Sequence, residues 1–128
     1  MIANRVCEGG GWNYGNASVI GQDLRPYVPS TAIALVALQD RRAVPAVNSS
    51  LAWLSGARSS EPSATALALA AIGLGVNGIE ANDVEARLAG DLDRVERIGN
   101  LQAMAMMLYV LTADRHRMAA FRHSSAAL

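Results

Sequence analysis

Small and apolar residues recur in three uncharged stretches, and most charged residues lie between them. The stretches are residues 31–38, 65–72 and 102–111, in which alanine alternates with leucine, isoleucine, valine or methionine. Their starting positions lie 34 and 37 residues apart (31 to 65, 65 to 102), about the length of a helix–turn–helix unit. A helix that is apolar on all sides must be covered on all sides. We therefore expect three helices of one kind, each fully buried.

Two intervening segments have the pattern of a helix with one buried face. Residues 45–54 begin with Pro45, which suits the first turn of a helix, and Gly56 is expected to end that helix. The second segment opens at Asn82 with a run that resembles a capping box. The apolar positions at helical spacing are Val47, Leu51 and Leu54 in the first segment and Val84, Leu88, Leu92 and Val95 in the second.

This alternation predicts an all-α fold made of about three helical hairpins, with one layer buried and the other half exposed. No run shows the strict alternation of a strand, so essentially no sheet is expected. The chain is interpreted as a single domain over residues 1–128. Residues 115–128 are expected to be a frayed C-terminal tail, with at most a partial helix at 115–123.

A glycine-rich aromatic loop, Cys7-Glu8-Gly9-Gly10-Gly11-Trp12-Asn13-Tyr14-Gly15-Asn16, precedes the first uncharged stretch. Together with the repeat, this order resembles the α/α-toroid superfamily of squalene and terpenoid cyclases and protein prenyltransferase β subunits. Gly10-Gly11-Trp12 matches the Gly-x-Trp end of a repeated cyclase motif, but the glutamine of that motif is absent. The resemblance implies a toroid. Three hairpins would form an open or partial ring, so the chain is expected to be a fragment of a longer protein or to oligomerise.

The resemblance also implies roles for residues of the loop. In the cyclases this motif is structural and ties hairpins together, which favours a structural role for Gly9, Gly10, Gly11 and Trp12. Cyclases also line their cavities with aromatic rings that stabilise cations. The ligand-lining candidates in this chain are Trp12, Tyr14, Tyr27 and Trp53; packing is the alternative role for all four. The implied ligand is an isoprenoid or another apolar small molecule.

The chemistry-bearing motifs of these enzymes do not recur in the chain. Asp91-Leu92-Asp93-Arg94 is nearest to the Asp-x-Asp-Asp of cyclases, but it ends in arginine and lies on the charged face of its helix. Ser30 stands where prenyltransferases have a zinc-binding histidine, and Cys7 lacks the expected aspartate context. No catalytic residue, metal or cofactor is predicted, and whether the chain is an enzyme stays open. The alternatives are a non-catalytic module that binds a protein or peptide, and a helical-hairpin polysaccharide lyase.

Charge and hydropathy narrow the classes of partner. The eleven basic residues, all arginine, balance eleven acidic ones, whereas nucleic-acid binders usually carry a basic excess. The longest uncharged run, residues 62–79, is interrupted by proline and glycines, which favours a buried helix over a membrane span. No signal peptide is recognised at the start. We expect a cytoplasmic chain without nucleic acid or a transmembrane segment, whose open ends are covered by missing repeats or a second copy.

Overall fold

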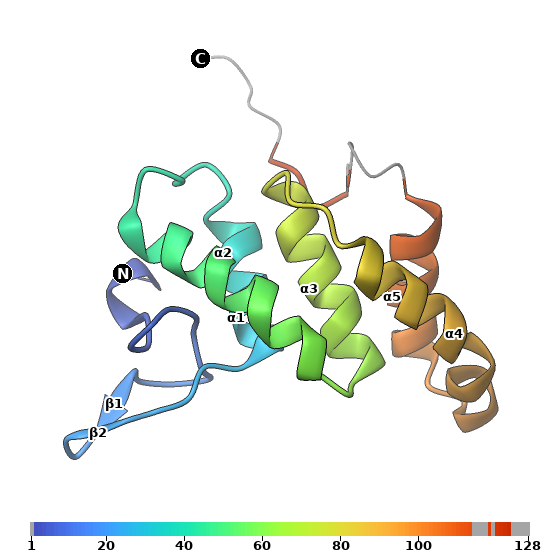
Figure 1. Cartoon of the computed structure of the whole chain (residues 1–128), viewed down its shortest axis with the longest axis horizontal. Helices are drawn as coiled ribbons and strands as arrows, with labels where there is room; N and C mark the ends of the chain where they lie inside the picture. Colours follow the sequence, from blue (N-terminus) through green and yellow to red (C-terminus); the bar gives the residue numbers. More distant parts are fainter. Residues whose placement is uncertain (1, 114–117, 119, 124–128) are drawn as a thin grey trace.

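The computed structural model describes residues 2–113, 118 and 120–123, and most of this part is helical (Figure 1). The predicted all-α class is confirmed. The elements are a 3₁₀ turn (Ile2–Arg5), strands β1 (Ser18–Val19) and β2 (Gln22–Asp23), helices α1 (Val28–Ala37) and α2 (Pro45–Ala57), a second 3₁₀ turn (Arg58–Ser60), and helices α3 (Ala64–Val76), α4 (Asn82–Ile98) and α5 (Leu101–Thr112).

The five helices form two layers. Helices α1, α3 and α5 run in the same direction, and α2 and α4 run back between them (Figure 1). Helix α3 packs against α1 on one side and α5 on the other, and its contact with α1 is the most extensive between the described elements. Helix α2 lies on α1 and α3, whereas α4 lies on α3 and α5. The central helix α3 therefore contacts all four others.

Burial follows from this arrangement. Most side chains of α3 are buried, as predicted for an uncharged helix. In contrast, Ile33 of α1 is 56% exposed and Leu101 of α5 is 76% exposed. The expectation that all three uncharged helices are covered on every side is therefore wrong for α1 and α5. Each of these two helices has a first-layer neighbour on one side only among the described elements.

The contact between α1 and α3 depends on small residues. A Cβ atom on Gly73 would lie 3.0 Å from the carbonyl oxygen of Ala32 and 3.3 Å from its Cβ, so the two backbones approach closely. The buried Asn77 side chain donates hydrogen bonds from Nδ2 to the carbonyl oxygens of Leu35 (3.1 Å) and Gly73 (2.9 Å). Close packing and polar bonding thus join the same two helices.

Two predicted helix boundaries are wrong. Helix α2 does not end at Gly56 but runs to Ala57. Helix α4 has Ala81 as its N-cap, without a side-chain cap, because Asn82 is already its first residue. The capping box therefore does not form, and the Asn82 amide donates instead to the Glu80 carboxylate at 3.2 Å.

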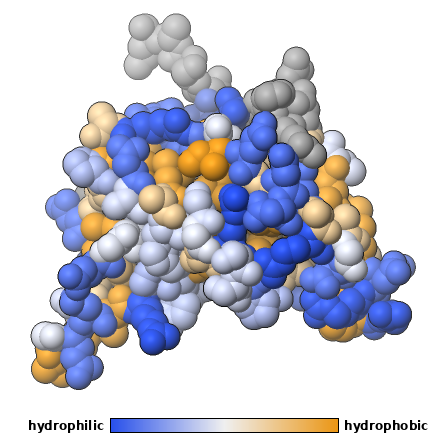
Figure 2. Space-filling view, in the orientation of Figure 1, coloured by the Kyte–Doolittle hydropathy of each residue, from blue (hydrophilic) through white to orange (hydrophobic). Residues whose placement is uncertain are grey.

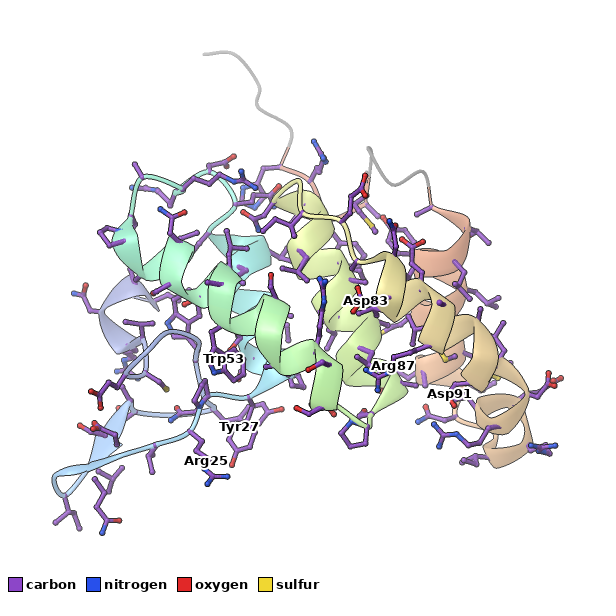
Figure 3. All side chains as sticks on the ribbon, in the orientation of Figure 1. Arg25, Tyr27, Trp53, Asp83, Arg87 and Asp91 are labelled. Atoms are coloured by element: carbon purple, nitrogen blue, oxygen red, sulfur yellow. The ribbon has the colours of Figure 1, made fainter. Side chains whose placement is uncertain are left out.

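Arg87 of α4 binds the chain where α2 ends, an interaction that no local pattern predicts. Figure 3 shows its place on α4 between Asp83 and Asp91. Its guanidinium donates to the carbonyl oxygens of Arg58 (2.8 Å), Ser59 (3.3 Å) and Glu61 (2.7 Å). A cation there complements the partial negative charge at a helix C-terminus. The outer helices are thereby linked to each other.

The remaining predictions concern the amount of β structure, the C-terminal tail and the absence of a membrane-spanning helix. The single pair of strands among the described residues is the β1–β2 hairpin, in agreement with essentially no sheet. Much of the predicted tail (115–117, 119 and 124–128) lies outside the described residues, whereas Met118 is buried and contacts the Gly75 region of α3. In the described part of the chain, every helix falls short of the length and hydropathy that a bilayer crossing requires.

The close contact of α1 and α3 predicts a large effect of Gly73→Leu. The new side chain has to push Ala32 away, so we expect the free energy of unfolding to fall by about 2 kcal/mol or more. Gly90→Leu is the matched control, because Gly90 lies inside α4 with open space around it. It is expected to be neutral or to stabilise by up to about 1 kcal/mol. Denaturant titration followed by circular dichroism measures both, and equal effects would contradict the packing described.

Candidate functional site

The loop before α1 lies against α2 in a path that requires glycine. Gly9, Gly10 and Gly11 have φ angles of 78°, 109° and 83°, in the left-handed region that side chains disfavour. A Cβ on Gly10 would lie 2.6 Å from the carbonyl oxygen of Ser49 in α2. A Cβ on Gly11 would lie 2.7 Å from the Cβ of Pro26. Backbone and neighbours thus occupy the space that larger residues need.

Two buried hydroxyl groups attach this loop to the helices. The Gly11 N–H donates to Ser50 Oγ of α2 at 2.8 Å, and the Trp12 N–H donates to Thr31 Oγ1 of α1 at 2.9 Å. The Ser50 hydroxyl in turn donates to the Ala46 carbonyl oxygen. Sequence reasoning missed Ser50 and Thr31. The signal that could have revealed them is a hydroxyl side chain on the otherwise apolar face of each helix.

Trp12 is the centre of the loop. The residue is 5% exposed, and its indole N–H donates to the Ile2 carbonyl oxygen at 2.9 Å. Its own carbonyl oxygen accepts from Ser30 Oγ (2.5 Å) and from the Tyr27 N–H (2.9 Å). Trp12 therefore connects the N-terminal turn, the loop and the start of α1.

The structure brings three of the four candidate aromatic residues together. The rings of Tyr14 and Tyr27 have centroids 5.4 Å apart and planes tilted by 32°, and both side chains are exposed. Tyr14 also lies on the edge of a groove that Trp12 lines. Trp53 comes from α2 (Figure 3) and lies against the glycine loop, because its ring would be 3.0 Å from a Cβ on Gly11. Trp53 does not line that groove.

This groove, which we call the α1 groove, is open and mainly apolar. It has a volume of about 370 Å³ and lies between the N-terminal turn, the loop and the uncovered face of α1. Its walls include Ile2, Arg5, Trp12, Tyr14, Ile33 and Ala37. The volume lies at the small end of the range for ligand pockets. A further hollow of about 300 Å³ lies between Tyr14 and Tyr27 and is bordered by Arg25.

The polar groups around the α1 groove are mostly engaged in the protein itself. Ser30 donates to Trp12, and the Asn13 side chain bonds to Gly15 and Asn16. Arg5 makes no ion pair with any residue that the structure describes. The groove can therefore hold an apolar body, and at its rim Arg5 is a cation without an ion-pair partner among the described residues.

Cys7 and Asp91 are poorly placed for chemistry in this groove. Cys7 is buried, and the loss of hydration raises the pKa of its thiol, which disfavours the reactive thiolate. Asp91 on α4 accepts hydrogen bonds from the Arg94 guanidinium at 3.0 and 3.1 Å, which lowers the pKa of the carboxyl group. A cyclase acid has to stay protonated, and Asp91 is held ionised. Among the described residues no three His, Cys, Asp or Glu side chains lie close enough to hold a metal ion.

Neither models of known protein families nor comparisons with curated proteins and solved structures give a match to this chain. The resemblance to the toroid superfamily therefore depends on the glycine loop and the repeated stretches alone. A function inferred from this resemblance is therefore a proposal.

The path of the loop predicts that Gly10→Ala lowers the free energy of unfolding by about 2–3 kcal/mol. The left-handed conformation alone costs an alanine about 1–2 kcal/mol, and the backbone of α2 blocks the new methyl group. Gly15→Ala is the control, because Gly15 is in the same loop with open space around it; its effect should stay within about 0.5 kcal/mol. Denaturant titration compares the two, and an unaffected Gly10→Ala variant would show that the loop does not lie against α2.

Proposed function

We propose that this chain is a helical-hairpin module similar to those of terpenoid cyclases and prenyltransferases, and part of a larger protein. In this proposal the α1 groove binds an isoprenoid or another apolar small molecule. The observation that carries it is the uncovered apolar face of α1 beside the aromatic rings of Trp12 and Tyr14. The parallel run of α1, α3 and α5, with α2 and α4 outside, supports the toroid-like part of the proposal, since a ring of hairpins has these two layers.

Binding is the activity that these walls favour. Ile33 and Ala37 offer aliphatic surface, and each square ångström of apolar area that a ligand removes from water contributes about 25 cal/mol. Trp12 is fixed by its hydrogen bonds, so its ring is already in place when a ligand arrives. Arg5 can orient a polar end of the ligand, but a guanidinium does not exchange protons near neutral pH. The groove thus supports recognition of a ligand.

Equilibrium dialysis with labelled farnesol, an isoprenoid alcohol, tests this proposal. We expect saturable binding, and we expect Ile33→Asp to weaken it at least tenfold because the variant places a charge in the apolar wall. Leu108→Asp is the matched control, since Leu108 is similarly exposed but lies on α5 at the other end of the layer. It should leave binding unchanged. The proposal fails if binding is not saturable or if both variants weaken it equally.

A second candidate function is a non-catalytic module that binds a protein or peptide. It is favoured by the free face of α5, where Leu101, Ala105 and Leu108 are exposed at positions that succeed one another along one side of the helix. These residues form an uncharged strip on which another amphipathic helix could pack. That helix could come from a further repeat of a longer protein or from a separate partner.

Binding of an apolar fluorescent dye, anilinonaphthalene sulfonate, tests whether the α5 strip is a surface of this kind. The double variant Leu101→Lys/Leu108→Lys should lose the part of the dye fluorescence that comes from α5, because two charges interrupt the apolar surface. Gln102→Lys adds a charge on α5 beside the strip, and this variant should keep the dye fluorescence of the wild type. The farnesol affinity should be the same in all three proteins. A wild-type chain that is monomeric and binds no dye would contradict the second candidate.

A further inference from the structure

The tip of the β1–β2 hairpin has a residue that folding alone does not explain. Ile20 is 99% exposed and has a φ of 51°, and the following Gly21 has a φ of 73°. Two successive positive φ angles are typical of a type I′ turn, in which Asn-Gly is the favoured pair. A β-branched residue is a rare and strained occupant of this conformation. Asparagine at position 20 would be both more relaxed and better hydrated.

The hairpin presents this residue away from the helices. It projects from the body of the molecule (Figure 1), and its end is an apolar area in the space-filling view (Figure 2). Val19 is also exposed, so the tip has two aliphatic side chains. Asp23 follows on β2; it is exposed and makes no ion pair with the described residues. The hairpin is thus an apolar knob with one acidic group beside it.

The α1 groove has the complementary properties. Its walls are apolar and uncovered, and its volume of about 370 Å³ is ample for an isoleucine side chain. Arg5 on its rim is a cation without an ion-pair partner in the described part of the chain. One molecule therefore has both an apolar knob with an acidic neighbour and an apolar hollow with a basic neighbour.

We propose that two copies of this chain form a symmetric dimer in which each inserts Ile20 into the α1 groove of the other. In this arrangement Asp23 of one copy pairs with Arg5 of its partner. A two-fold exchange uses both knobs and both grooves and closes the assembly, whereas one-way insertion would continue into a filament. The proposal goes beyond ligand binding, since the dimer needs no small molecule in order to form. A ligand in the groove would compete with the hairpin.

Sedimentation equilibrium of the full chain tests the role of Ile20. We expect a reversible monomer–dimer equilibrium at micromolar concentrations. Ile20→Asn should weaken dimerisation at least tenfold without lowering the melting temperature, because it relieves the strained turn. Ile98→Asn is the control, since Ile98 is a highly exposed isoleucine at the end of α4, and it should dimerise as the wild type does. A monomeric wild type, or an Ile20→Asn variant that dimerises equally well, would overturn the proposal.

A charge exchange tests the pairing of the two copies. Asp23→Arg and Arg5→Asp should each weaken the dimer several-fold by placing like charges together, and the double variant should restore it. Failure of the double variant to restore dimerisation would refute the proposed pairing. Wild-type binding to phosphatidylcholine vesicles without self-association would show that the tip meets lipid instead, and would also overturn the dimer. Ile20→Asn should still bind farnesol, which separates this inference from the proposed function.

Discussion

The backbone of residues 10–12 lies directly against α1 and α2, and the rest of the candidate site takes its position from this contact. Glycine at 10 and 11 lets the chain approach without side chains, in conformations that other residues avoid. The hydroxyl groups of Ser50 and Thr31 then satisfy the backbone N–H groups that the loop buries. Trp12 is fixed as a result and forms one wall of the α1 groove. Tyr14 and the β1–β2 hairpin come next in the chain, between this fixed point and the start of α1.

The helical frame explains why the available surfaces lie at its ends. Helix α3 is covered by all four other helices, and the small residues Ala32 and Gly73 let α1 approach it closely. Helices α1 and α5 are uncharged like α3 but have fewer neighbours, so Ile33 and Leu101 are exposed. Contiguous exposed apolar area is typical of surfaces that bind a ligand or another protein. The same incomplete covering thus produces the α1 groove at one end and the α5 strip at the other.

Periodicity and charge predicted the helices well, because both are local properties. The uncharged stretches and the two amphipathic segments all became helices. Local patterns could not predict how many neighbours a helix has, so α1 and α5 were expected to be buried like α3. Nor could they predict that Arg87 would bind the chain after α2, since its acceptors lie more than twenty residues away. The local signals at Gly56 and Asn82 did not set the ends of α2 and α4.

The candidate site was predicted only in part, because its loop is a local feature and the partners that hold the loop are distant in sequence. The loop was visible as a cluster of glycines and aromatic residues, but its anchors were not, because Ser50 and Thr31 lie 39 and 19 residues from the groups they bind. The separation of Trp53 from the groove also depends on how α2 packs. Composition identified the residue types, and only the tertiary arrangement decides which of them face a common space.

Amide hydrogen exchange, followed residue by residue with NMR, tests most directly whether the loop is part of the helical core. The amides of Gly11 and Trp12 donate to buried hydroxyl groups, so opening them requires the loop to leave α1 and α2. They should exchange nearly as slowly as the amides in the middle of α3, although they belong to no helix or strand. Exchange of both amides as fast as that of Gly21 at the exposed hairpin tip would contradict this account.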